Sequence, residues 1–355
     1  MPNRIPVSIL GATGSVGQRF VQLLDKHPWF EVVALTGSNR SVGMTYGEAC
    51  HWILTEPMPG WARRITITPS ESITAEVRIA FSALPSDKAR LLEPLLAGAG
   101  LAVCSNASAF RDAPDVPILL PEVNPDHTDL VQIQRRQRGW SGCIVTNSNC
   151  TSTGLTVALK ALQGAFGLKR VLAVSLQALS GAGYPGVASL DIADNVIPYV
   201  KGEESKVEDE PRKILGEMNA EGLTKSGFVI SAHTNRVAVS DGHLVCASVE
   251  CESAPDVDTA SRVLSEYQAP AVSRGLPSAP QPVILVRDEP DRPQPRLDRW
   301  SGQGMTTVVG RLRPDPIFHL KFVVLSHNTV RGAAGGSIYN AELLVEKGLI
   351  SGDRH

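Results

Sequence analysis

The residue best suited to covalent chemistry is Cys150, in the stretch TNSNCTSTGL. The pattern that follows, TVALKAL, predicts a helix that begins near the cysteine. The unpaired N–H groups and dipole of a helix N-terminus stabilise a thiolate, and the same groups can hold an oxyanion formed by attack on a carbonyl. Asn149 can add a side-chain donor. Alternatively, Cys150 is a small buried residue beside a capping Asn149 or Ser148, and the motif alone does not decide.

Two further stretches carry side chains that such a cysteine needs. His243, in RVAVSDGHLVCASVE, follows an Asp-Gly turn at the start of a predicted strand, where an acid/base can be held rigidly and still reach a cleft. Arg236 precedes it by seven residues and can bind a carboxylate through two hydrogen bonds. SNASAFR supplies Asn106 and Arg111, a candidate clamp for an oxyanion or a phosphate. Each of these side chains can instead be an ordinary surface residue.

The charged stretch YVKGEESKVEDEPRKILG places Glu203 and Lys206 three residues apart, on one side of a helix. Glu203 can accept a substrate ammonium and Lys206 can bind a phosphate. Glu210 and Lys213 repeat the spacing, so composition alone does not select the first pair, and a solvated helix face explains the stretch equally well.

Gly11, Gly14 and Gly17 follow a short apolar run and open a helical pattern. Glycines in that context allow a tight turn and a close backbone approach, and the helix N-terminus then faces a pyrophosphate, which predicts a dinucleotide site. The next predicted strand runs into TGSNRSVG, which lacks the carboxylate that binds the ribose 2′-OH of NAD. Ser38, Arg40 and Ser41 stand there instead, which favours the 2′-phosphate of NADP.

Length and composition exclude several classes of protein. A chain of 355 residues with 43% hydrophobic and 20% charged residues favours two folded domains. A net charge of −2 gives no footprint for nucleic acid, and no apolar run approaches the roughly 20 residues of a membrane span. Six cysteines and eight histidines show neither a disulfide framework nor metal-ligand spacing, so we expect no metal. The N-terminus lacks a signal peptide, which predicts a cytoplasmic protein.

The order of predicted elements gives an α/β fold with two parts. Strand, glycine turn, helix and strand alternate up to Cys150, as in a Rossmann-type domain with a parallel sheet. Six strand candidates with fewer helices follow, at 169–183, 227–239, 242–251, 281–288, 305–313 and 318–327, and they predict an α+β domain on a mainly antiparallel sheet. We therefore predict a nucleotide-binding domain over 1–149 and a catalytic and dimerisation domain over 150–329. An amphipathic C-terminal helix within 330–355 is expected to pack back on the first domain.

Together these motifs resemble the aspartate-semialdehyde dehydrogenases, most closely the branch found in archaea and fungi. The resemblance rests on GATGSVGQRF, GSNRS, SNASAFR, SNCTSTGL, the long block from Gln177 to Gly216, NRVAVSDGH and SHNTVRGAAGGSI, in the family's order over nearly the whole chain. It implies a Rossmann domain, a dimerisation and catalytic domain, and a homodimer or homotetramer. It also implies reversible NADP-dependent conversion of L-aspartyl 4-phosphate to L-aspartate 4-semialdehyde and phosphate through a cysteine thioester, in the biosynthesis of lysine, threonine, methionine and isoleucine.

The resemblance also assigns roles to individual positions. It implies catalytic roles for Cys150 as nucleophile, His243 as acid/base, Gln177 and Asn149. Substrate-binding roles fall on Arg236 for the carboxylate, Glu203 for the amine, Lys206 and Arg111 for the phosphate, and Asn106. The predicted cofactor contacts are Gly11, Thr13, Gly14, Ser15, Val16, Ser38, Arg40, Ser41, Ser82, Ser180, Gly181, Gly183 and Asn328.

Three other functions stay open at this point. An acyl-CoA reductase of the same fold, such as a malonyl-CoA reductase, shares the cysteine thioester and NADPH but expels a thiol and needs no amine site. N-acetylglutamyl-phosphate and glyceraldehyde-phosphate dehydrogenases share the logic but carry different residues around the cysteine. A non-catalytic NADP-binding regulator keeps the glycine turn and has no use for Cys150.

Overall fold

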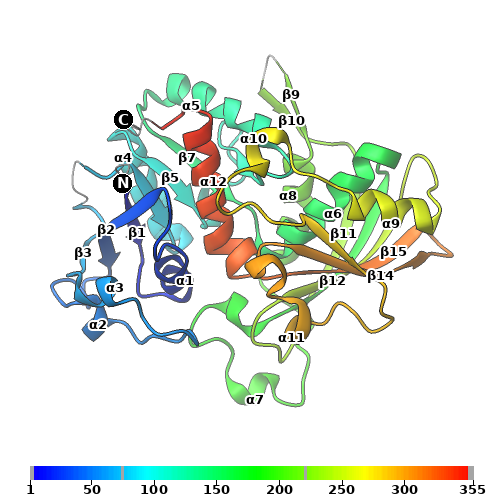
Figure 1. The fold of residues 1–355 in the computed structure, drawn as a ribbon, viewed down its shortest axis with the longest axis horizontal. Coiled ribbons are helices and arrows are strands. Elements are labelled where there is room, and N and C mark those ends of the chain that lie inside the picture. The colour runs from blue at the N-terminus through cyan, green and yellow to red at the C-terminus, as the bar shows by residue number, and fades with distance from the viewer. Residues whose placement is uncertain (1–3, 73–75, 220–221, 351–355) are drawn as a thin grey trace.

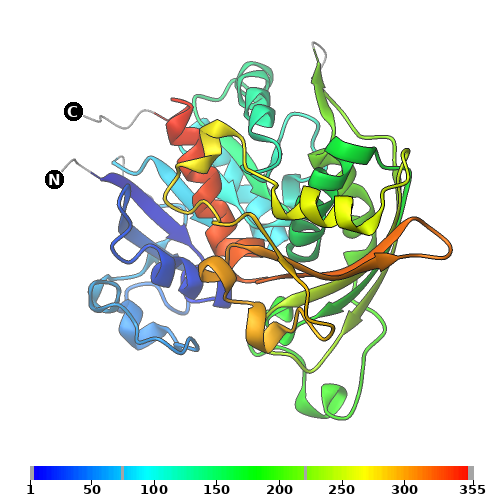
Figure 2. The ribbon, with the colours of Figure 1, turned by 45° about the vertical axis from the view of Figure 1, so that its right-hand side comes forward.

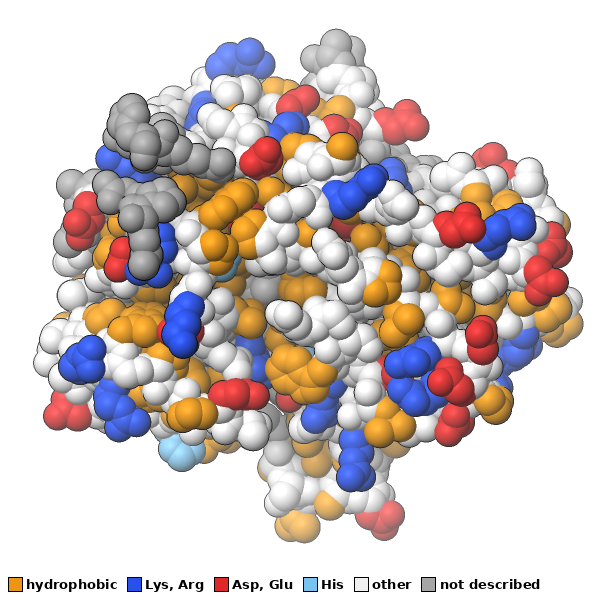
Figure 3. All heavy atoms as spheres, viewed as in Figure 1, with side chains coloured by type: hydrophobic (Ala, Val, Ile, Leu, Met, Phe, Trp, Pro, Cys, Tyr) orange, Lys and Arg blue, Asp and Glu red, His pale blue; other side chains and the backbone are white. Residues whose placement is uncertain are grey.

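The computed structural model describes residues 4–72, 76–219 and 222–350 of the chain. Two large sheets organise these residues, each with a hydrophobic core of its own (Figure 1). Positive and negative side chains are interspersed on the face that Figure 3 presents. In the described part of the chain, no helix combines the length and apolar character that crossing a membrane requires.

Seven parallel strands form the first sheet, in the order β3-β2-β1-β4-β5-β7-β6. They are β1 (Ile5–Leu10), β2 (Phe30–Gly37), β3 (Thr68–Pro69), β4 (Ile79–Ser82), β5 (Ala102–Ser105), β6 (Ile118–Leu119) and β7 (Cys143–Asn147). Starting from β1, successive strands of the chain are added on one side of the sheet as β2 and β3 and on the other side from β4 onward. In sheets of this kind, ligands bind where the order reverses, outside the carboxyl ends of the strands. The glycine turn follows β1, so the predicted dinucleotide site lies there.

Helices cover both faces of the first sheet. They include α1 (Ser15–Leu23), α2 (Tyr46–Ala49), α3 (Gly60–Arg64), α4 (Ser86–Gly98) and α5 (Leu130–Arg138). The apolar side of α1 packs on one face, where the rings of Phe20 and Phe81 lie 5.1 Å apart, and α4 packs on the other. This arrangement confirms the predicted Rossmann-type domain.

The C-terminal helix α12 (Gly335–Glu346) packs on the first sheet although it is far away in sequence (Figure 1). Ile338, Ala341 and Leu344 join the core of β1, β4 and β5. The prediction that this helix is amphipathic is wrong, because it is buried from Gly335 to Val345. Its other side packs with Leu276 and neighbouring residues, so no polar face is needed. The division into 1–149 with 330–355, and 150–329, stays a proposal, and residues 351–355 lie outside the described range.

Six strands form the second sheet, in the order β11-β8-β12-β15-β14-β13. They are β8 (Arg170–Gln177), β11 (Val229–Arg236), β12 (His243–Glu250), β13 (Ile284–Arg287), β14 (Thr307–Pro314) and β15 (Leu320–Ser326), and a small hairpin joins β9 (Glu217–Asn219) to β10 (Gly222–Thr224). The three central pairs are antiparallel and the two edge pairs are parallel. The sheet is therefore mixed, with the predicted antiparallel pairs in the majority.

One face of the second sheet is covered by α6 (Cys150–Phe166), α8 (Glu203–Ile214) and α9 (Val257–Ser265). Figure 2 shows this sheet as a curved layer with helices on its inner side. The remaining helical segments are short: α7 (Ser189–Ile192), α10 (Ala271–Arg274), α11 (Pro295–Asp298), the 3₁₀ turns η1 (Ser108–Phe110), η2 (Pro125–Asp129), η3 (Leu179–Ala182) and η4 (Ser301–Gly304), and the π-helical turn η5 (Val330–Ala334). Helix α6 thus runs from the end of β7 in the first sheet to the core of the second.

Candidate active site

Cys150 is the first residue of α6, three residues after β7 ends. Asn149 caps this helix, since its Oδ1 accepts hydrogen bonds from the backbone N of Thr151 (3.0 Å) and Ser152 (3.2 Å). The Cys150 Sγ lies 3.2 Å from Nε2 of His243. The two interpretations of TNSNCTSTGL are therefore compatible: Asn149 is the cap, and the thiol beside it faces a histidine as a nucleophile would.

His243 begins β12 in the second sheet and is 1% exposed. Its Nδ1 accepts a hydrogen bond from the backbone N of Ala178 at 3.0 Å. Burial, and next the nearby Arg236 and His327, lower the pKa of His243 to about 3. The ring is neutral at pH 7 as a result.

The environment of the thiol differs from the one predicted at a helix N-terminus. Burial, and next the negative charge of Glu203, raise the pKa of Cys150 to about 12. Arg111, Arg236 and Lys206 act in the opposite direction. The thiol pKa is therefore raised, not lowered as a helix N-terminus would predict. The effects of burial and of the Glu203 carboxylate outweigh the effect of the three cations.

Helix α8 holds the turn before the cysteine at two points. Asn149 Nδ2 donates to Oε2 of Glu203 at 2.7 Å, and the Asn149 backbone N donates to Oε2 of Glu210 at 2.5 Å. Lys206 Nζ donates to Oε1 of Glu203 at 2.7 Å. The predicted Glu203–Lys206 pair is therefore formed beside the cysteine, and the amide of Asn149 is engaged by Glu203 as well as by the helix it caps.

The second pair with the same spacing has a different place. Lys213 is buried, and its Nζ donates to the backbone oxygens of Arg111, Ala113 and Val116 at 2.6, 2.7 and 2.8 Å. Those three bonds use all of its donors. Glu210 accepts from Nη1 of Arg111 at 2.9 Å, in a pair that is almost fully buried. The structure thus separates the two pairs, with Glu203 and Lys206 beside the thiol and Lys213 committed to the backbone.

Arg236 ends β11, and its guanidinium lies on the histidine side of the site. Its Nη1 donates to the backbone O of Ala178 at 2.6 Å. Gln177, at the end of the neighbouring β8, donates from Nε2 to Ser175 Oγ at 3.3 Å. A Cβ on Gly181 would lie 2.9 Å from Nη1 of Arg236 and 3.1 Å from the His243 ring, so the η3 turn approaches both side chains closely.

Asn328 ties the η3 turn to the turn before His243. Its Nδ2 donates to Ser180 Oγ at 2.8 Å, and its Oδ1 accepts from the backbone N of Gly242 at 2.8 Å. Across the site, Asn106 donates from Nδ2 to the backbone O of Ser82 at 3.1 Å, at the carboxyl ends of β4 and β5. The predicted cofactor residues Ser180 and Asn328 therefore lie in turns of the second domain, and Ser82 lies at the carboxyl end of β4 in the first sheet.

The glycine turn has the geometry of a nucleotide-binding turn. Gly11 has φ +72°, and a Cβ on Gly17 would lie 2.3 Å from the backbone O of Gly11, so no larger residue fits. Gly14 caps α1 without a side-chain hydrogen bond, which leaves the first N–H groups of the helix to a ligand. At the end of β2 the Arg40 side chain is exposed and Ser41 Oγ donates to the backbone O of Ser38 at 2.9 Å.

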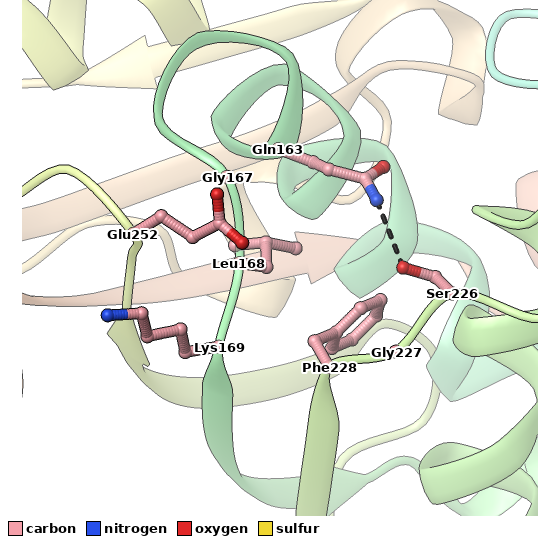
Figure 4. A pocket seen from close by; sticks show the side chains of 8 residues that line it. All are labelled: Gln163, Gly167, Leu168, Lys169, Ser226, Gly227, Phe228 and Glu252. Carbon is pink, nitrogen blue, oxygen red and sulfur yellow. Dashed lines mark hydrogen bonds between the residues drawn. The ribbon is translucent and has the colours of Figure 1, made fainter.

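A separate surface pocket of about 450 Å³ lies at the other end of α6 (Figure 4). Its lining includes Gln163, which donates to Ser226 Oγ at 3.2 Å, and Glu252, whose carboxylate points toward Gly167. Gln163 is thirteen residues from Cys150 along a continuous helix, which is roughly 20 Å. This pocket contains none of the predicted site residues.

Sequence reasoning missed three groups that the structure places around the nucleophile. They are Glu210, the backbone N–H of Ala178, and Gly332 in η5, where an added Cβ would lie 2.8 Å from the Cβ of Cys150. Gly332 belongs to the quoted motif SHNTVRGAAGGSI, yet nothing in its spacing indicated a contact with residue 150. Ala178 offers no signal, because the group that matters belongs to the main chain.

A family model for a semialdehyde dehydrogenase NAD-binding domain matches residues 6–131, and one for a semialdehyde dehydrogenase dimerisation domain matches residues 159–331. An aspartate-semialdehyde dehydrogenase of Archaeoglobus fulgidus is 50% identical over 98% of this chain and 100% of its own length. The chain belongs to the aspartate-semialdehyde dehydrogenase family.

Other members of the aspartate-semialdehyde dehydrogenase family agree with the predicted branch. The Schizosaccharomyces pombe enzyme is 47% identical over 97% of this chain and 99% of its own length. The crystal structure of the Candida albicans enzyme with NADP has a TM-score of 0.90 and 43% identity, covering 98% of this chain and 100% of that one. These comparisons confirm the archaeal and fungal resemblance and the two-domain fold.

We expect Glu210→Gln to raise the KM for the acyl phosphate about tenfold, because Arg111 and the Asn149 N–H lose a charge-assisted acceptor worth about 1.5 kcal/mol. Initial rates at several substrate concentrations measure this. Asp209→Asn, on the exposed side of the same helix, is the matched control and should behave as the wild type. An unchanged KM in Glu210→Gln would show that Arg111 needs no such support.

Proposed function

We propose that this chain catalyses the reversible, NADP-dependent conversion of L-aspartyl 4-phosphate to L-aspartate 4-semialdehyde and phosphate, a step in the biosynthesis of lysine, threonine, methionine and isoleucine. The observation that carries the proposal is the 3.2 Å contact between Cys150 Sγ and His243 Nε2 at the start of α6, surrounded by separate cations and a carboxylate. Its family relatives, which carry this enzyme name, support the same conclusion.

Each charged group of this substrate has a side chain of opposite charge near the thiol. Arg236 offers a guanidinium for the α-carboxylate, and Glu203 offers a carboxylate for the α-ammonium. Lys206 and Arg111, whose charges both act on the Cys150 thiol, suit the phosphate. A substrate ammonium that binds Glu203 neutralises the charge that raises the thiol pKa, so substrate binding favours the thiolate.

The residues of the NADP site fit the cofactor. The uncapped N-terminus of α1 suits a pyrophosphate, and Ser38, Arg40 and Ser41 suit a 2′-phosphate, since TGSNRSVG contains no carboxylate. Ser180, Gly181 and Asn328 stand beside His243, where the nicotinamide must meet the substrate. When bound, NADPH supplies the hydride for the reduction.

Cys150 and its neighbours then perform the acyl transfer. The Cys150 thiolate attacks the acyl carbon, the bond to the phosphate oxygen breaks, and Lys206 and Arg111 stabilise the departing anion. The resulting thioester is reduced, and the oxyanion formed there faces the backbone N–H of Cys150, because those of Thr151 and Ser152 are bonded to Asn149. His243, in contact with the sulfur, is the side chain placed to exchange a hydrogen bond or a proton with these atoms.

An assay in the reverse direction tests the proposal. Aspartate semialdehyde and NADP should yield NADPH only when phosphate is added, and NAD should serve less well than NADP. The same preparation is then given malonyl-CoA and NADPH. Oxidation of NADPH by malonyl-CoA, without phosphate-dependent turnover of the semialdehyde, would replace the proposal with an acyl-CoA reductase.

We propose that the chain acts in the cytoplasm, as the sequence predicts. We further propose that it forms a homodimer or homotetramer through the outer face of the second sheet. The family model for this part of the chain is a dimerisation domain. Leu172 on β8 and Val229 on β11 lie on the outer face and are 38% and 59% exposed. Apolar side chains on an open sheet face are typical of a subunit contact.

The expected result for the double variant Leu172→Lys, Val229→Lys is a shift toward the monomer mass of about 37.9 kDa, because two charges would face the partner. Sedimentation velocity measures the mass. Leu91→Lys, an exposed leucine on α4 of the first domain, is the matched control and should leave the assembly intact. An assembly unchanged in the double variant places the contact elsewhere.

A further inference from the structure

Helix α8 carries the same pair of charges twice along one side. Glu203 and Lys206 recur seven residues later as Glu210 and Lys213, and seven residues are close to two helical turns, so all four lie along the same side of the helix. The first pair lies beside the turn that carries the thiol. The proposed reaction uses this first pair for the substrate, and it gives no role to Lys213.

The ammonium of Lys213 lies inside a loop of the first domain, residues 111–116, which leads from η1 to β6. Burial lowers the pKa of Lys213 to about 8, so most of this side chain is still charged at pH 7. An ammonium has three N–H donors, and each has one acceptor here, the backbone O of Arg111, Ala113 and Val116 at 2.6, 2.7 and 2.8 Å. The loop is therefore closed around a single side chain that belongs to the other domain.

Arg111, the first residue of this loop, is held at its main chain and at its side chain. Its carbonyl accepts from Lys213, while its guanidinium donates from Nη1 to Oε1 of Glu210 at 2.9 Å and from Nη2 to the backbone O of Asn106 at 2.8 Å. Only 7% of Arg111 is exposed, so these contacts set the direction of its guanidinium. The charge of this guanidinium acts on the Cys150 thiol.

Glu210 connects the same loop to the turn before the nucleophile. Its Oε1 accepts from Arg111, and its Oε2 accepts from the backbone N of Asn149 at 2.5 Å. Glu210 and Lys213 are three residues apart on one helix, so the two anchors of Arg111 keep a fixed separation from each other and from Asn149. In an acyl phosphate a single oxygen joins the acyl carbon to the phosphorus, so the group that binds the phosphate must also keep a fixed distance from the attacking sulfur.

We propose that Lys213 is a positioning residue, which sets the Arg111 guanidinium at the place beside Cys150 where the phosphate of the substrate binds. The inference deepens the proposed function and rests on it for the identity of the phosphate. Lys213 acts through the main chain of Arg111, because the loop uses all three of its donors and leaves none for a phosphate. Its loss should therefore weaken phosphate binding selectively, since the substrate carboxylate faces Arg236 at the end of β11.

Initial rates of the full-length enzyme in the reverse direction test this selectivity, with phosphate and semialdehyde varied separately. Lys213→Met keeps an unbranched apolar stem and removes all three donors, so the KM for phosphate should rise about tenfold while the KM for the semialdehyde stays within about twofold. Lys213→Gln keeps two donors, should give an intermediate KM, and replaces the Met variant if that protein does not fold. Lys225→Met, an exposed lysine that pairs with Asp209 at 3.8 Å, is the matched control and should behave as the wild type. Equal changes in the two KM values, or none, would overturn the proposal.

Hydrogen exchange of the same proteins measures the loop itself. The backbone amides of 111–116 should exchange about tenfold faster in Lys213→Met than in the wild type, and those of α6 should not change. Unchanged exchange in the loop would contradict the proposal, and so would faster exchange with an unchanged KM for phosphate, because Lys213 would then only stabilise the loop. The exchange measurement needs no substrate. A wild-type protein without phosphate-dependent turnover therefore counts against the proposed function, separately from the hold of Lys213 on the loop.

Discussion

Cys150→Ala is expected to lower turnover at least about 10⁴-fold, because the variant loses the sulfur atom that carries the acyl group in the proposed reaction. The helix it begins should remain intact, since Asn149 Oδ1 still caps the N–H groups of Thr151 and Ser152. Phosphate-dependent reduction of NADP by aspartate semialdehyde measures the activity. Binding of NADP, followed by fluorescence, should stay within about twofold of the wild type, because the nucleotide turn lies on the other sheet.

Cys246→Ala is the matched control for this prediction. Cys246 is the exposed cysteine on the outer face of β12, and its neighbours in the sheet include no predicted site residue. Its removal should leave the turnover of the enzyme unchanged. Full activity in Cys150→Ala would exclude the thioester mechanism and favour a protein that binds NADP without using this thiol.

The fold was predictable from the sequence because its signals are local. The helical apolar spacing of Val16, Phe20 and Leu23 and the glycine turn before it specify the first βαβ unit without help from the rest of the chain. The six strands of the second sheet coincide with the six apolar stretches that the sequence offers for them. The sequence could not show which edge pairs are parallel, since strand order depends on packing between distant segments.

The candidate site was predictable only in its parts. Cys150, His243 and Arg236 each stand at the end of an element, where a side chain can reach a cleft. Their environment, however, comes from long-range contacts. The thiol pKa is raised by burial first and then by the charge of Glu203, which lies 54 residues from its partner Asn149, so the lowered pKa expected from the helix N-terminus is not found. The N–H that bonds to Nδ1 of His243 belongs to the main chain of Ala178, 65 positions away, so no side chain could have indicated it.

The close contact between η5 and Cys150 leads to the second large effect. Gly332 packs directly on the nucleophile, since a Cβ added there would lie 2.8 Å from the Cβ and 2.9 Å from the Cα of Cys150. The turn has little freedom to retreat, because the neighbouring Arg331 is fully buried and donates from Nε to Oε1 of Glu122 at 2.9 Å. π-helical turns of this kind are frequent at functional sites.

Gly332→Ala is therefore expected to lower kcat about 100-fold, because the added methyl group displaces the first residue of α6 and a shift of about 1 Å in a reacting group costs that much. The KM for the semialdehyde should change less, since Arg236 and Glu203 lie on other elements. Gly164→Ala is the matched control: it lies in the same helix with no atom within 4 Å of the added Cβ, and it should keep full activity and gain up to about 1 kcal/mol of stability. Thermal unfolding of both variants separates a displaced nucleophile from a general loss of structure. A folded Gly332→Ala protein with wild-type kcat would show that the contact with η5 does not position Cys150.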